Sequence, residues 1–148
     1  MTVSVPRTAI IIGPTAGGKT ALAVACATLF AHRTNARAEI ISADSMLVYR
    51  GLDIGSAKPT PDEMGGVPHH LIDICDPTQS FTVQEWLERA EATITAIRGR
   101  GHWPIVVGGT HLYVKALLDG LFEGPSGRRS CHSRTSWRTR TRGASRSA

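Results

Sequence analysis

A glycine-rich octapeptide near the N-terminus constrains the fold of this chain more than any other feature. It reads Gly13-Pro14-Thr15-Ala16-Gly17-Gly18-Lys19-Thr20 and matches the pattern G-x-x-x-x-G-K-[ST] of a phosphate-binding loop. The apolar run 9–12 precedes it, and an alanine-rich stretch follows from Thr20. This context predicts a buried strand, the loop and then a helix, which is the beginning of an α/β fold.

The residue types of the octapeptide suit an anionic ligand. Glycines allow backbone angles that let successive N–H groups point at one anion, and the start of a helix adds the positive end of its dipole. We expect Lys19 to bind the outer phosphate oxygens and the Thr20 hydroxyl to bind Mg²⁺. The prediction is a magnesium-bridged di- or triphosphate compound; the alternative is a glycine-rich turn that binds nothing.

Composition indicates one globular domain. The 148 residues are 41% hydrophobic and 20% charged, as in ordinary soluble domains. No apolar run approaches the roughly 20 residues of a membrane helix, and residues 1–7 do not resemble a signal peptide, so a cytoplasmic protein without membrane contact is expected. The three cysteines (Cys26, Cys75 and Cys131) lack metal-ligand spacing, which predicts free thiols.

Charge is distributed unevenly along the chain. Of the 17 Lys and Arg residues seven lie in 126–148, which leaves ten against twelve Asp and Glu in 1–125. The net charge of +5 therefore does not indicate a nucleic-acid-binding surface on the whole chain. The shift predicts two regions: a catalytic domain in 1–125 and a disordered Arg/Ser/Thr-rich tail in 126–148.

Hydrophobic patterning predicts a parallel sheet flanked by helices. Strands are expected at 8–12, 38–43, 69–74 and 104–107; helices at 18–32, 81–98 and 111–119; and a long irregular loop at 52–68. Thr82 and Glu85 match a capping box for the second helix. Because ligands bind beyond the carboxyl ends of parallel strands, Asp44 and Thr110 should lie beside the phosphate-binding loop.

These two polar residues have functional and purely structural interpretations. A carboxylate near a bound phosphate repels it, so Asp44 would either hold metal or act as a base on a second substrate. Alternatively, Asp44 and Thr110 are simply helix N-caps. The pair His69-His70 is expected to form structural hydrogen bonds rather than a metal site, and Trp86 is expected in the core.

Several motifs together resemble one family. The octapeptide is similar to a GPTASGKT-type loop, and the segments 41–45, 48–59, 67–73 and 107–121 extend the likeness in order. They resemble the tRNA dimethylallyltransferases (tRNA isopentenyltransferases). The resemblance implies a P-loop NTPase-like parallel sheet flanked by helices. Since chains of that family are much longer, it also implies a sheet that is incomplete at the C-terminus.

The resemblance implies transfer of a dimethylallyl group from dimethylallyl diphosphate to N6 of the adenosine next to the anticodon in tRNA. The loop would grip the diphosphate with Mg²⁺ bound at Thr20, Asp44 would accept the proton of the amine, and Thr110 would bond the bridging oxygen. The expected partners are tRNA and dimethylallyl diphosphate, with the protein a monomer. Residues implied to contact tRNA are Asp44, Ser45, Met46, Leu47 and Thr110.

The chain departs from the family pattern in three places. Met46-Leu47 stands where Arg-Gln is frequent, and His111 stands where Gly is common. The likeness is expected to stop near Pro125. We interpret the tail as the product of a frameshift; a basic RNA-binding arm is the alternative.

Two other functions stay open at this level. One is a P-loop kinase or ATP-binding NTPase for a small molecule, although no apolar strand followed by a metal-binding Asp comes after the third strand. The other is a non-enzymatic RNA-binding remnant that uses 126–148; deletion of the tail should then abolish RNA binding.

Overall fold

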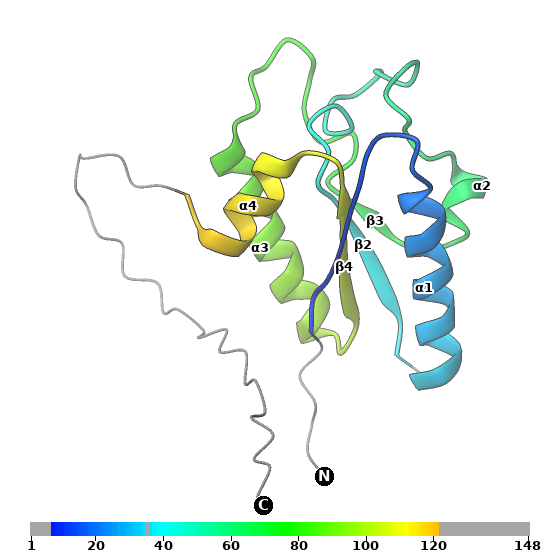
Figure 1. Ribbon diagram of the computed structural model, residues 1–148. Coiled ribbons are helices and arrows are strands. Elements are labelled where there is room, and N and C mark those ends of the chain that lie inside the picture. The colour runs from blue at the N-terminus through cyan, green and yellow to red at the C-terminus, as the bar shows by residue number, and fades with distance from the viewer. Residues whose placement is uncertain (1–6, 35, 122–148) are drawn as a thin grey trace, which may run out of the picture.

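The computed structural model describes residues 7–34 and 36–121, and it forms a parallel α/β layer structure (Figure 1). The turn expected at Asn35 and the tail 126–148 lie outside the described residues. The strands are β1 (Ala9–Ile12), β2 (Ala38–Ser42), β3 (His69–His70) and β4 (Trp103–Gly108). The helices are α1 (Lys19–Thr34), α2 (Pro61–Met64), α3 (Val83–Gly99) and α4 (His111–Asp119).

The four strands pair in the order β1-β4-β2-β3, and every pairing is parallel. Strands β1 and β2, which α1 connects, are not neighbours in the sheet, because β4 lies between them. The register aligns Ile12 with Gly108 and Ser42 with Val107. The carboxyl ends of β1, β4 and β2 therefore lie side by side at one edge, which is where ligands bind in such sheets.

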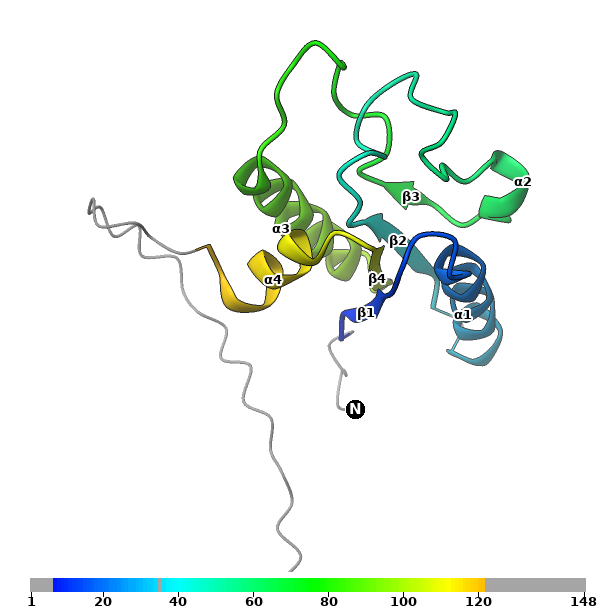
Figure 2. The ribbon, with the colours of Figure 1, turned by 45° about the horizontal axis from the view of Figure 1, so that its top comes forward.

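Helices cover both faces of the sheet, α1 on one face and α3 and α4 on the other (Figure 2). Side chains alternate along β2, so that Ile40 packs under α1 and Ile41 under α3 and α4. Trp86 is fully buried, which confirms the core position expected from the sequence. The core therefore comes from both faces of the strands, as in other parallel sheets.

Helix ends follow local sequence signals. Thr82 caps α3, and Glu85 bonds back to it, which confirms the predicted capping box. The same pattern, Thr60 with Glu63, caps the short helix α2 inside the segment 52–68 that was expected to be irregular. That helix was missed, although the capping box and the Pro61 after its cap are both visible in the sequence.

Strand β3 is shorter than expected. A strand over 69–74 was predicted, but pairing ends at His70, and the prediction is wrong beyond that residue. Leu71 and Asp73 have φ angles of +61° and +56°, in the left-handed region, which no β-strand contains. The chain turns there, and Cys75 then forms an isolated parallel bridge with Tyr49, outside the four strands.

Within residues 7–34 and 36–121, no helix combines the length and apolar character that crossing a membrane requires.

Candidate functional site

The octapeptide forms the tight connection between β1 and α1 (Figure 1). The Gly17 N–H donates to the Pro14 carbonyl at 3.2 Å, and a Cβ on Gly17 would lie 3.0 Å from that oxygen. Gly18 has a φ of +70°, which side chains rarely tolerate. Gly18 is therefore required by the loop geometry, whereas a side chain at Gly17 would only make a tight contact with Pro14.

Lys19 and Thr20 occupy the first turn of α1, where the helix dipole favours an anion. The Lys19 ammonium lies back over the loop and donates to the Pro14 carbonyl at 2.5 Å. Thr20 borders a hollow of about 210 Å³, which is also lined by Ala21, Ala57, Pro59 and Glu63. No described residue hydrogen-bonds the Thr20 hydroxyl, so this oxygen can serve a ligand.

The end of β4 lies between the end of β2 and the phosphate-binding loop. A Cβ on Gly108 would lie 2.1 Å from the Ala43 carbonyl oxygen, so only glycine permits this approach of two backbones. A Cβ on Gly109 would lie 3.3 Å from the Gly13 carbonyl oxygen and 3.9 Å from Lys19 Nζ. The Gly-Gly pair thus brings Thr110 within reach of both neighbours.

Thr110 and Asp44 are brought to this common edge. The Ser45 N–H donates to Thr110 Oγ1 at 3.0 Å, and the Thr110 N–H donates to the Ala43 carbonyl at 3.2 Å. Thr110 occupies the N-cap position of α4, yet its side chain makes no cap hydrogen bond. Its hydroxyl therefore serves the segment after β2 rather than its own helix.

Asp44 sits in a turn rather than at the start of a helix. Its Oδ1 accepts the Met46 N–H at 2.9 Å, and residues 45–48 are turn residues. The N-cap alternative is thus wrong, but a local role in shaping the turn is real. Of the residues expected to contact RNA, Met46 is half exposed, while Ser45 and Leu47 are partly buried.

An aromatic pair that sequence reasoning missed underlies the turn at Asp44. The Trp86 indole N–H donates to the Ser42 carbonyl at 2.9 Å, and Trp86 stacks on Tyr113 with ring centroids 4.7 Å apart. Burial raises the pKa of the Tyr113 hydroxyl, and nearby Tyr49 and Asp44 raise it further. The signal available in the sequence was the position of Tyr113 three residues after Thr110, on the apolar side of its helix.

The donor atoms at this edge suit magnesium. The Thr20 hydroxyl and the Asp44 carboxylate offer hard oxygen atoms, which Mg²⁺ prefers, together with water and substrate phosphates. Among the described residues, no group of three or more His, Cys, Asp or Glu side chains is arranged for a metal ion.

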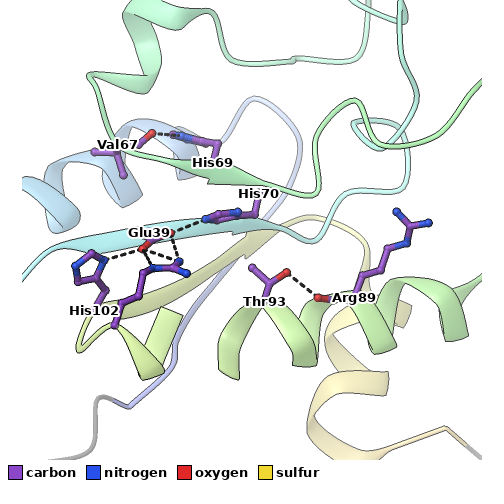
Figure 3. Close-up of polar contacts among 8 residues, drawn as sticks. Glu39, Val67, His69, His70, Arg89, Thr93 and His102 are labelled. Carbon is purple, nitrogen blue, oxygen red and sulfur yellow. Dashed lines mark hydrogen bonds and ion pairs between the residues drawn. The ribbon is translucent and has the colours of Figure 1, made fainter. Parts of the chain in front are cut away.

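One buried carboxylate, that of Glu39, lies near the start of β2, away from the candidate site, and is surrounded by basic side chains (Figure 3). The Glu39 side chain, 5% exposed, accepts from Arg100 at 2.9 Å and contacts His70 at 2.6 Å and His102 at 2.7 Å. His69 contacts the Val67 carbonyl at 2.8 Å. Both residues of the His69-His70 pair thus make the structural hydrogen bonds that were expected of them.

Glu39→Gln is expected to destabilise the fold in a pH-dependent way. Burial raises the pKa of Glu39, but hydrogen bonds from His102, His70 and Arg100 outweigh it and lower the pKa from 4.5 to about 2. The ionised form therefore stabilises the fold by about 3 kcal/mol above pH 4.5, and this stabilisation is lost as the pH falls towards 2. Urea unfolding of the parent chain and of Glu39→Gln, measured between pH 7 and pH 2, should show a difference in the free energy of unfolding. This difference should become smaller as the pH falls. Glu91→Gln, on the exposed face of α3, is the control; an equal effect of both substitutions would contradict the account.

Two family models match the chain. The model described as IPP transferase matches residues 47–147, and the model described as isopentenyl transferase matches residues 6–77. The first match continues beyond Pro125, where the likeness was expected to stop, so the frameshift interpretation of the tail stays a prediction.

Relatives and solved structures agree with these models. The chain is 54% identical over 121 residues to tRNA dimethylallyltransferase 2 of Syntrophus aciditrophicus, and the match covers 82% of this chain and 37% of that protein. The crystal structure of the tRNA isopentenylpyrophosphate transferase of Bacillus halodurans is similar with a TM-score of 0.70 and 51% identity, over 80% of this chain and 37% of that one. A eukaryotic dimethylallyltransferase acting on tRNA gives a TM-score of 0.72 with 31% identity, over 85% of this chain and 30% of that one.

The chain thus spans about a third of the length of the relatives it matches. Its phosphate-binding loop, its parallel sheet and both family models agree, and the chain belongs to the IPP transferase family.

Proposed function

We propose that this chain is the substrate-binding part of an enzyme that transfers a dimethylallyl group from dimethylallyl diphosphate to N6 of the adenosine next to the anticodon in tRNA. One observation carries the proposal: the phosphate-binding loop, Asp44 and Thr110 meet at the carboxyl ends of three adjacent parallel strands. A carboxylate beside an anion-binding loop suits a reaction in which one substrate leaves as diphosphate and the other loses a proton.

On the donor side, the bond from carbon 1 of the dimethylallyl group to the bridging oxygen breaks. The loop N–H groups and Lys19 stabilise the negative charge that develops on the departing diphosphate. The Thr110 hydroxyl donates a hydrogen bond to the bridging oxygen and keeps its proton. Bound at Thr20 and the diphosphate, Mg²⁺ would supply further charge neutralisation.

On the acceptor side, the amine nitrogen at N6 of adenine forms the new bond to carbon 1. Asp44 accepts the proton that this nitrogen loses, while its Oδ1 stays oriented by the Met46 N–H. Ser45, Met46 and Leu47 would contact the flipped-out adenosine. The reaction balances: one C–O bond is exchanged for one C–N bond, and one proton passes to the carboxylate.

The proposal includes Mg²⁺ as cofactor, dimethylallyl diphosphate and tRNA as substrates, a monomeric chain and a location in the cytoplasm with its tRNA substrate. It assigns residues 1–125 to the catalytic domain. The relatives' greater length means that full transfer activity is proposed for this domain joined to a complete C-terminal part.

Binding measurements separate this function from that of a small-molecule kinase. The chain should bind dimethylallyl diphosphate with Mg²⁺ at least about tenfold more tightly than ATP, since its loop is proposed to hold the diphosphate of the prenyl donor. Lys19→Met should weaken diphosphate binding about 100-fold, because a charged hydrogen-bond donor is lost. Lys115→Met, exposed on α4, is the matched control. Tighter binding of ATP would favour the kinase, and an unchanged affinity in Lys19→Met would exclude the loop as the diphosphate site.

A further inference from the structure

A buried lysine joins three separate segments beside the candidate site. The side chain of Lys58 is 9% exposed. Its ammonium donates to Asp53 Oδ1 at 2.7 Å, to Asp73 Oδ1 at 2.5 Å and to the Tyr49 carbonyl at 3.3 Å. All three donors of one ammonium are thus used on groups 5 to 15 positions away in the chain.

One partner of Lys58, Asp73, lies in a turn that is hydrogen-bonded to the segment that continues from Asp44. The Leu47 carbonyl accepts the Asp73 N–H at 3.0 Å, and the Val48 carbonyl accepts the Ile74 N–H at 2.8 Å. Arg50 Nε donates to the Asp73 carbonyl at 2.8 Å. The segment from Leu47 to Arg50 is therefore hydrogen-bonded along the turn that contains Asp73, and these bonds hold the segment in place.

That supporting turn has an unfavourable backbone. Leu71 and Asp73 have positive φ angles although neither is glycine, and such conformations persist only where surrounding contacts enforce them. Asp73 is held through its carboxylate by Lys58 and through its carbonyl by Arg50. Removing Lys58 leaves the strained turn with one of these two restraints.

The ammonium stays charged in this position. Burial acts to lower the pKa of Lys58, but the hydrogen bonds that its ammonium donates to Asp53 and Asp73, together with their negative charges, outweigh it, so the pKa is raised. A lysine that bound a free phosphate would need an unused donor, whereas the three donors of Lys58 are taken by the chain itself.

We propose that Lys58 is a positioning residue: it fixes the turn at Asp73, and through that turn it orders the segment 45–47 against Asp44 and Thr110. Lys58 itself touches no substrate. Its effect on RNA binding rests on the function proposed above, whereas its effect on the order of the segment does not.

Amide hydrogen exchange in the full chain tests the ordering directly. Lys58→Met keeps the length of the side chain and removes its charge. Exchange at Ser45, Asp73 and Ile74 should become about tenfold faster or more, while exchange at Ile105 and Val106 in β4 stays within about twofold. The control Lys115→Met removes the same charge from an exposed position and should change none of these rates. Unchanged exchange at Ser45 and Asp73 in Lys58→Met would overturn the proposal.

Ligand binding then separates positioning from general destabilisation. Lys58→Met should bind an anticodon stem-loop RNA about tenfold more weakly than the parent chain, with magnesium diphosphate affinity within about twofold. An equal loss of both affinities would show that Lys58 only supports the fold, and would overturn the positioning role. If the parent chain alone binds no such RNA, the exchange rates decide on Lys58, and the proposed function is decided separately by the transfer assay with a complete C-terminal part. If Lys58→Met does not fold, Asp53→Asn serves as the second variant, because it removes the charge of one exposed partner of Lys58. This substitution should accelerate amide exchange at Ser45. Unchanged exchange at Ser45 would count against the proposal.

Discussion

Asp44→Asn is expected to lower the rate of dimethylallyl transfer by about 10²- to 10⁴-fold without weakening the binding of dimethylallyl diphosphate. The amide keeps an oxygen that can accept the Met46 N–H, now 2.9 Å from Oδ1, so the turn is preserved. What it loses is the ability to take the proton from the adenine amine. The effect thus falls on the chemical step rather than on the loop that holds the diphosphate.

The assay requires a chain of full family length. Residues 7–121 of this protein can replace the matching segment of the Bacillus halodurans enzyme, with which the chain is 51% identical. Single-turnover transfer to tRNA would be measured with the parent segment, Asp44→Asn and Asp119→Asn, the last being an exposed aspartate at the end of α4. Near-parent rates in Asp44→Asn would reduce Asp44 to a turn-forming residue.

Gly108→Ala is expected to destabilise the domain strongly. The added Cβ would lie 2.1 Å from the Ala43 carbonyl oxygen and 2.4 Å from its carbon, and neither backbone can move without breaking the pairing of β2 with β4. We expect a loss of at least about 3 kcal/mol, a large part of the stability of an ordinary domain. In a thermal melt this corresponds to a fall in Tm of roughly 15 °C.

Gly99→Ala is the matched control for this substitution. A Cβ on Gly99, the last residue of α3, would meet no atom within 4 Å, and alanine favours helix. Its Tm should stay at or slightly above that of the parent. Equal melting temperatures for Gly108→Ala and Gly99→Ala would contradict the close approach of the two strand ends.

The elements that the sequence predicted are those with local signals. The capping box of Thr82 and Glu85 placed the start of α3, and the apolar run before Gly108 placed β4 within one residue. All five residues of β2 are buried, as in a strand covered on both faces, and a short apolar run was enough to predict it. Even the missed helix α2 carried such a signal at Thr60.

What the sequence did not predict depends on contacts between distant residues. The pairing of Lys58 with Asp73 and the stacking of Trp86 on Tyr113 arise only after the sheet brings their segments together. Strand β3 ends at His70 because Leu71 has a left-handed backbone conformation. A leucine in the sequence does not predict this conformation. Glu39 looked like one more strand residue, because its three partners come from elsewhere in the fold.

The candidate site depends both on local sequence signals and on contacts between distant residues. The glycines of the octapeptide predicted the positive φ at Gly18, whereas the φ of +60° at Ala16 is not predicted by its residue type. The approach of Thr110 to Ser45, by contrast, depends on β4 lying between β1 and β2, an order that no local pattern encodes. The convergence of loop, carboxylate and hydroxyl therefore needed both a motif and a topology.

The most direct test of the central claim is to follow radiolabel from dimethylallyl diphosphate into tRNA with the chimeric enzyme that carries residues 7–121 of this chain. The account predicts label on N6 of the adenosine next to the anticodon, with diphosphate released in equal amount. A folded chimera that binds magnesium diphosphate and tRNA yet transfers no label, or that transfers a phosphoryl group from ATP instead, would contradict it.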